Sequence, residues 1–145
     1  MQQNQLITHW LSFSNLQMKI TNELESSLQE KHQLSLNEFY VLLFLSEAPH
    51  KKLKLQQLQN RVGLSQSAMS RLVSRFEARD CGVLERNICI DDRRAIYTSL
   101  TAEGEVKLKN ALVSFNETLE RTFSKESVLE ELQQITNQLK EDGSK

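Results

Sequence analysis

Glycine and proline are scarce in this chain, and their scarcity limits the number of turns that it can make. The sequence has 145 residues, of which four are glycine and one is proline. Both residues usually mark turns and loops, so a chain with few of them is expected to form long helices with short connections. The length is that of one compact domain. We therefore expect a single domain over residues 1–145 that is mainly α-helical.

The composition excludes several other classes of protein. The chain is 39% hydrophobic and 26% charged, which excludes a disordered or collagen-like chain. Its longest apolar run, Val41–Leu45, is far shorter than the roughly 18 residues of a membrane span. The first residues lack the basic segment of a secretory signal, and two cysteines are too few for a disulfide scaffold. We expect a cytoplasmic protein with no membrane partner.

The charges are divided unevenly along the chain. Residues 51–95 contain ten basic and five acidic residues and carry +5, whereas the remainder carries −6, which gives the total of −1. Such an asymmetry says more about binding partners than the net value does. A basic middle segment is compatible with an anionic partner or with an ordinary solvated face.

The spacing of apolar residues predicts long helices at both ends of the chain. Residues 6–28 form one stripe at helical spacing, and residues 108–139 form another with a break near Ser124. Between them, a buried helix begins after Ser35 or Asn37, either of which can cap it. Residues 53–62 predict a short helix. Residues 83–90 and 95–100 alternate and predict a β-hairpin, after which Thr101 caps the last helical region.

Two short helices joined by a glycine-containing turn, Leu55–Val73, match the helix-turn-helix pattern. Gly63 can adopt the positive φ at which the first helix ends, and Leu64 is expected to lie buried between the helices. Ser65 can cap the second helix, whose first two turns carry the polar side chains that meet base edges in such proteins. The predicted DNA-binding residues of this segment are Ser65, Gln66, Ser67, Ser70, Arg71 and Arg75.

A β-hairpin directly after a recognition helix is the wing of a winged helix. Its tip, residues 91–94, is charged. A narrow minor groove concentrates negative potential and favours an inserted arginine, so we expect Arg94 there and Arg93 at a backbone phosphate. Asp92 can orient Arg94 through a bidentate ion pair.

These motifs resemble the MarR (multiple antibiotic resistance regulator) family. Asp91–Gly104 is similar to the Asp-x-Arg wing and following Leu-Thr-x-x-Gly of that family, and Leu64–Val73 is similar to its recognition helix. The resemblance implies a homodimeric transcriptional regulator that binds a near-palindromic operator in double-stranded DNA. Such a regulator is usually a repressor that a small ligand or oxidation releases. The winged helix would span residues 36–101.

The apolar stripes at the two ends exceed what a winged helix of about 50 residues can cover. We therefore expect residues 4–32 and 104–141 to form a helical dimerisation part. The sequence departs from the family pattern at Gln59, where the family usually has a small alanine. The link over residues 78–85 is also about two residues longer than is common.

The sequence leaves two kinds of effector site as alternatives: a ligand pocket and a redox-sensitive cysteine. In the resembling family the ligand cleft lies between the dimerisation helices and the winged helix, although aromatic residues at helical spacing can equally be core. The candidates here are Trp10, Phe13, Phe39, Tyr40 and Phe44. Cys81 and Cys89 are candidate redox residues, because nearby arginines can lower the pKa of a thiol. Packing is the favoured role for both cysteines, since the resembling oxidation sensors carry a reactive cysteine in the first helix.

The sequence contains no pattern typical of an enzyme, a cofactor site or a metal site. It has no phosphate-binding glycine loop, and its three histidines are scattered without ligand spacing to a cysteine. One alternative function is a dimeric winged-helix adaptor that binds protein. Salt distinguishes the two, because DNA binding through about eight phosphates predicts a steep loss of affinity as salt rises.

Overall fold

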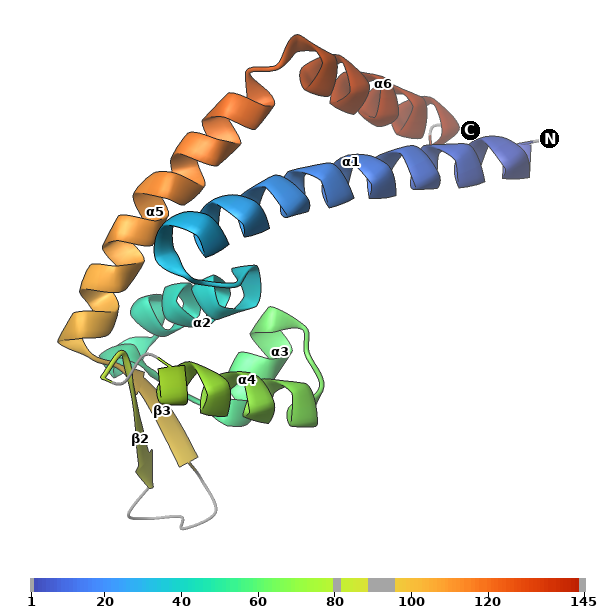
Figure 1. The fold of residues 1–145 in the computed structure, drawn as a ribbon. Coiled ribbons are helices and arrows are strands. Elements are labelled where there is room, and N and C mark those ends of the chain that lie inside the picture. Colours follow the sequence, from blue (N-terminus) through green and yellow to red (C-terminus); the bar gives the residue numbers. More distant parts are fainter. Residues whose placement is uncertain (1, 80–81, 89–95, 144–145) are drawn as a thin grey trace.

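The computed structural model describes residues 2–79, 82–88 and 96–143 and forms a winged helix joined to three long helices (Figure 1). The elements are α1 (Gln2–His32), α2 (Leu36–Glu47), the 3-10 helix η1 (Pro49–Lys51), β1 (Lys52–Lys54), α3 (Leu55–Val62), α4 (Gln66–Arg79), β2 (Leu84–Ile88), β3 (Ile96–Leu100), α5 (Ala102–Phe123) and α6 (Glu126–Gly143). The predicted fold class, mainly α-helical with a small β-hairpin wing, is confirmed.

The helix boundaries follow local capping signals. Of the two candidate caps for α2, the structure uses Ser35, whose hydroxyl accepts the backbone N–H of Glu38 at 3.1 Å. The Glu38 carboxylate accepts the backbone N–H of Ser35 in return, at 2.7 Å, which completes a capping box. Thr101 caps α5 as expected, and Gly63 ends α3 with φ of 86°.

The sheet has three antiparallel strands in the order β1-β3-β2. The predicted hairpin supplies β2 and β3. The prediction that residues 53–62 form one helix is wrong at its start, because Lys52–Lys54 form a strand and the helix begins at Leu55. The strand forms because β3 offers it an unpaired edge, where Lys54 pairs with Tyr97.

The core of the winged helix lies around α2. Phe39 has no exposed surface and stacks on Phe115 of α5, with ring centroids 4.5 Å apart. Buried residues of α3 and α4, including Leu58 and Phe76, extend the same core. Because α5 contributes to it, the long helix is anchored rigidly to the winged helix at this end.

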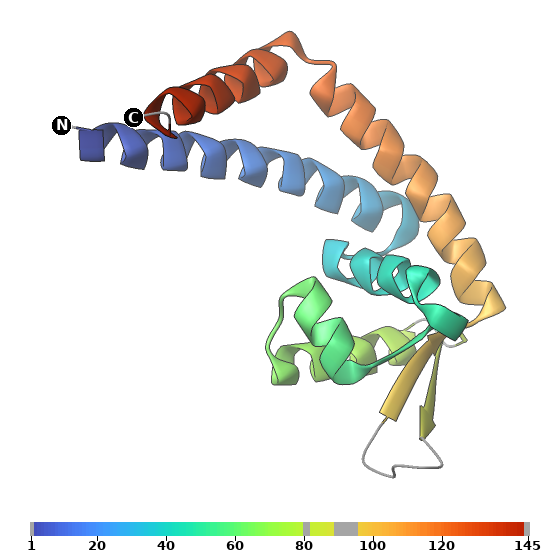
Figure 2. The same cartoon turned by 180° about the vertical axis from the view of Figure 1, so that it is seen from behind.

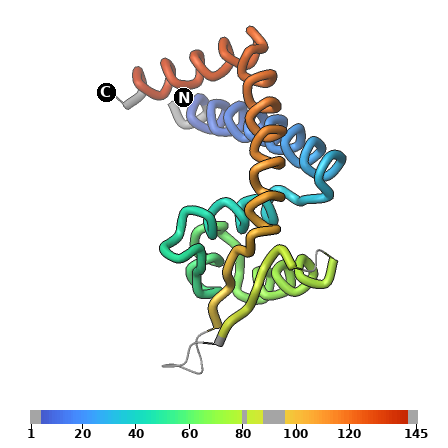
Figure 3. The backbone as a smooth tube through the Cα atoms, turned by 90° about the vertical axis from the view of Figure 1, so that its left-hand side faces the viewer, coloured from blue at the N-terminus to red at the C-terminus, as the bar shows by residue number. Residues whose placement is uncertain are grey.

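The long helices form a frame beside the winged helix. Figures 1 and 2 show α6 folding back along α1, so that the two termini lie near each other. Figure 3 shows α5 running from the wing to this pair. The N-terminal half of α1 exposes large apolar side chains, among them Trp10, which is 65% exposed. No helix of the described residues is long and apolar enough to cross a membrane.

Candidate nucleic-acid interface

The recognition helix α4 has one buried and one polar face. Met69, Val73 and Phe76 are fully buried on the side that packs against the core. All six DNA-binding residues predicted in this segment are exposed. These are Ser65, Gln66, Ser67, Ser70, Arg71 and Arg75. The helix therefore presents hydroxyl, amide and guanidinium groups to solvent.

The N-terminus of α4 is capped as the sequence predicts. The Ser65 hydroxyl accepts the backbone N–H of Ala68 at 3.2 Å, and the Ser65 carbonyl accepts that of Met69 at 2.9 Å. The N-terminal end of a helix carries a partial positive charge, which favours a nearby phosphate. Arg71 lies one turn further on, where its Nε donates to the carbonyl of Ser67 at 3.3 Å.

The turn between α3 and α4 depends on the carbonyl group of Gln59. This oxygen accepts the backbone N–H groups of Gly63 at 2.9 Å and Leu64 at 3.1 Å. Leu64, which was expected to be buried, is half-buried and packs against the core. The Gln59 side chain, together with Leu55, Gln56 and Gln66, lines a cavity of about 260 Å³ between the two helices. Gln59, the position at which the family usually has a small alanine, is therefore one of the residues that line a cavity next to Gln66, the first residue of α4.

Arg86 of β2 joins the wing to one side of α4. Its Nε donates to Glu77 at 2.9 Å, and a terminal nitrogen donates to the hydroxyl of Ser74 at 3.1 Å. Both acceptors lie in the C-terminal half of α4, so the bonds fix the angle between wing and recognition helix. The sequence alone does not single out Arg86, because its partners lie 9 and 12 residues earlier in the chain.

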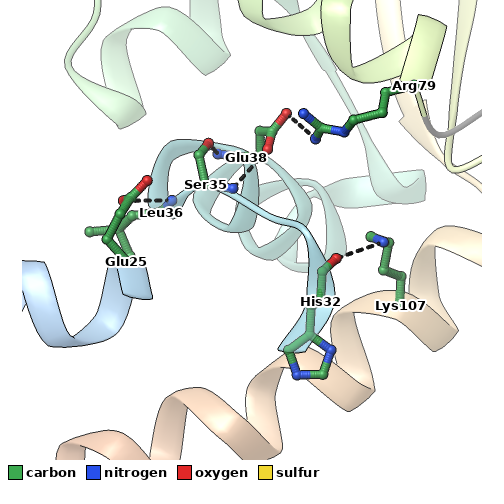
Figure 4. A network of polar contacts seen from close by, with 7 residues as sticks. All are labelled: Glu25, His32, Ser35, Leu36, Glu38, Arg79 and Lys107. Atoms are coloured by element: carbon green, nitrogen blue, oxygen red, sulfur yellow. Dashed lines mark hydrogen bonds and ion pairs between the residues drawn. The ribbon is translucent and has the colours of Figure 1, made fainter. Parts of the chain in front are cut away.

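Glu38 of α2 holds the other side of α4. Arg79 donates to its carboxylate at 2.5 Å (Figure 4). Glu38 is only 5% exposed, whereas the Arg79 side chain is 47% exposed. Since the same carboxylate completes the capping box of α2, one acidic side chain connects the start of α2 with the end of α4.

The corner between α1 and α2 continues this network toward the long helices (Figure 4). Glu25 of α1 accepts the backbone N–H of Leu36 at 2.9 Å. Lys107 of α5 donates to the carbonyl of His32 at 3.1 Å, and the His32 ring lies 2.7 Å from the Ser114 hydroxyl. Polar contacts therefore run from α5 and α1 through α2 to the recognition helix.

A cavity of about 460 Å³ separates α4 from this corner. Arg71, Arg75 and Arg79 line it from α4, and polar residues such as Gln29 and Asn37 line the other side. Arg75 lies in the third turn of α4, beyond the first two turns at its N-terminal end. Its position is suited to a phosphate more than to a base edge, because base contacts come from the first turns of a recognition helix.

The predicted wing-tip and redox residues lie outside the described residues. These are Asp92, Arg93 and Arg94 at the tip, and Cys81 and Cys89 on either side of β2. The structure describes the strands that lead to the tip, and their register from Leu84↔Leu100 to Ile88↔Ile96 is that of a regular antiparallel hairpin.

The five aromatic residues proposed for an effector pocket fall into two groups. Trp10 and Phe13 lie together in the exposed part of α1, with ring centroids 6.4 Å apart. Phe39, Tyr40 and Phe44 lie on α2, where the rings of Tyr40 and Phe44 stack at 5.9 Å. Because Phe39 is fully buried against Phe115, it serves the core in the single chain. The described residues contain no group of three or more potential metal ligands.

A capped polar recognition helix held beside an antiparallel hairpin defines a winged helix-turn-helix protein. Residues 32–95 match the family model described as MarR family. The chain is 30% identical over 114 residues to the HTH-type transcriptional repressor MdtR of Bacillus subtilis, covering 79% of this chain and 70% of MdtR. It is 28% identical over 112 residues to the homoprotocatechuate degradative operon repressor of Escherichia coli, covering 77% and 72%.

A solved structure has a similar fold. Sco3205, a MarR family transcriptional regulator from Streptomyces coelicolor crystallised in complex with DNA, superimposes with a TM-score of 0.77 at 22% identity. The match covers 98% of this chain and 88% of Sco3205. The chain belongs to the MarR family of transcriptional regulators.

Proposed function

We propose that this protein is a homodimeric repressor that binds a near-palindromic operator in double-stranded DNA. The observation that carries the proposal is the exposed polar face of α4, which lies opposite the buried Met69, Val73 and Phe76. The curated relatives are named as transcriptional repressors, which supports the sign of regulation and a function without catalysis. No cofactor is needed for this activity.

Each exposed residue of α4 has a role that its chemistry suits. Gln66 can pair bidentately with adenine, and Arg71 with guanine or a phosphate. Ser67 and Ser70 offer hydroxyl groups to base edges, and Ser65 leaves the helix N-terminus facing a phosphate. Arg93 and Arg94 would extend the contact into the adjacent minor groove, with Asp92 orienting Arg94.

Dimerisation would cover the apolar surface that the single chain exposes. Leu6, Trp10 and Leu11 of α1 and Leu129 and Leu139 of α6 are 49–65% exposed. Residues 4–32 and 104–141 would bury these side chains against a second copy. A two-fold axis would also place two recognition helices in successive major grooves. Sedimentation equilibrium at micromolar concentration should give twice the mass of the chain, and a monomeric mass would contradict the proposal.

Selection of bound sites from a random DNA pool tests the function directly. The purified protein should enrich an inverted pair of half-sites whose centres lie about 10 base pairs apart. Substituting Gln66 should then change the preferred bases, whereas substituting Arg71 or Arg75 should weaken binding more uniformly. Lys51→Gln, which removes a charge that already forms an ion pair with Glu105, is the matched control and should leave both properties unchanged.

The adaptor function is the alternative outcome of the same experiment. An absence of enriched sequence, together with an affinity for DNA that barely falls as salt rises, would favour it. Release from DNA by a small ligand or by oxidation is a further part of the proposal. If Cys81→Ser and Cys89→Ser leave peroxide-induced release unchanged, oxidation of these thiols is excluded as the signal.

A further inference from the structure

The outer edge of the wing sheet carries two lysines over one aromatic ring. In the pairing of β1 with β3, Lys52 lies opposite Ser99 and Lys54 opposite Tyr97, while Leu53 between them is buried. The two lysines therefore share the outer face of the sheet. Their ammonium nitrogens lie 5.2 Å and 5.7 Å from the centre of the Tyr97 ring. Each distance is within the range of a cation–π contact.

Neither ammonium group has a carboxylate partner among the described residues. The neighbouring Lys51 forms an ion pair with Glu105. Glu85 is in the same row of the sheet as Lys52, but it lies on β2 beyond β3, about 10 Å away at two strand spacings. Two like charges gathered at one ring repel each other, so this site favours an anion that can lie between them.

The pairing register of β1 with β3 places Lys52 and Lys54 near the tip end of the wing. Tyr97 is the second residue of β3, and the antiparallel pairing puts Lys54 toward the tip and Lys52 toward the base. The opposite edge of the sheet, β2, faces α4 through Arg86. The lysine pair is therefore on the edge remote from the recognition helix. If the wings of the proposed dimer enter the flanking minor grooves, that edge would lie on the side of the wing away from the half-site that α4 contacts, next to the DNA beyond the operator.

We propose that Lys52 and Lys54, held over Tyr97, bind backbone phosphates of the DNA that flanks the operator. This inference rests on the proposed DNA-binding function. The Tyr97 ring restrains two flexible side chains, which reduces the rotamer entropy lost when they bind a phosphate. The pair adds affinity without sequence preference, because phosphate contacts carry no base information directly.

Duplexes of two lengths test the proposal. One contains only the two half-sites and the base pairs under the wings, and the other extends this core by ten base pairs at each end. Affinities are measured over a series of salt concentrations for the unaltered dimer and for the K52Q/K54Q variant. The matched control is K51Q, which removes the adjacent charge that Glu105 already neutralises.

The extended duplex should show the effect and the core duplex should not. Loss of two phosphate contacts per chain should lower the slope of log affinity against log salt by about 3.6 per dimer, at about 0.9 per phosphate. K51Q should retain the original slope. An unchanged slope for K52Q/K54Q on the extended duplex would overturn the inference, as would an equal loss on both duplexes. Failure of the unaltered dimer to bind either duplex would instead refute the proposed function.

Discussion

The ion pair between Glu38 and Arg79 allows a quantitative test of how the recognition helix is held in place. The perturbation is a double-mutant cycle of Glu38→Gln, Arg79→Gln and the double variant. Glutamine at position 38 keeps an oxygen that can accept the Ser35 backbone N–H, so the capping box of α2 is retained. The cycle therefore isolates the charged contact with Arg79.

The expected coupling energy follows from the unequal burial of the two groups. Exposed ion pairs couple by about 0.2–1 kcal/mol, whereas removing one partner of a buried pair costs about 3–5 kcal/mol. Glu38 is 5% exposed, but the Arg79 side chain is 47% exposed and can be solvated again when its partner is removed. We therefore expect a coupling of about 1–1.5 kcal/mol, slightly above the range for exposed pairs and well below the cost of breaking a buried pair.

Urea denaturation of the four proteins at one protomer concentration measures this coupling. Equal concentration is required because the unfolding of the proposed dimer would depend on it. Each single variant should lose stability, and the double variant should lose less than the sum. A coupling below about 0.4 kcal/mol, within the usual limits of additivity, would refute the reasoning that this pair anchors α4. DNA affinity should fall in the same order as stability.

Three further changes have effects that the structure predicts. Ser65→Ala removes the cap of α4 and should lower the free energy of unfolding by about 1 kcal/mol, measured by urea denaturation. It should also weaken DNA binding. Gly104→Ala should destabilise the protein by about 1–3 kcal/mol, because a methyl group there would overlap the carbonyl oxygen of Val83; an unchanged melting temperature would contradict this. Burial, reinforced by two nearby lysines, lowers the pKa of His32, so the unfolded chain takes up the proton more readily. Stability should therefore decline as the pH falls below about 6.5. His32→Gln, which can keep the contact with Ser114, should flatten the decline, and parallel pH profiles would count against it.

The sequence predicts those features of the fold that local interactions determine. The caps at Ser35 and Thr101 and the end of α3 at Gly63 depend on residues within one turn, so their signals are present in the sequence. The strand Lys52–Lys54 has no such signal. It is three residues long and exists only because Tyr97, more than forty residues later, lies on an edge that can pair with it.

The residues of the candidate site also fall into those that the sequence predicts and those that it does not. In residues 65–71 the helical period separates the polar positions from the buried face. The sequence alone therefore predicts which of these side chains are exposed. The contacts of Arg86 with Glu77 and of Arg79 with Glu38 cannot be read from spacing, since each requires two elements to be packed first. Helical spacing does not distinguish exposed from buried aromatic residues. Trp10 and Phe39 have similar spacing, yet Trp10 lies on the surface and Phe39 lies in the core.

The side-chain hydrogen bonds described above between α4 and its neighbours involve Ser74, Glu77 and Arg79, which lie in the second half of the helix. The side chains that would meet base edges stand in the first half. In the proposed complex, support and recognition would therefore be carried by different residues of one helix. A lineage that duplicates this gene could exchange Gln66, Ser67 or Ser70 and acquire a new operator while the frame around the helix stays intact. The separation of the two halves makes the recognition sequence easy to evolve.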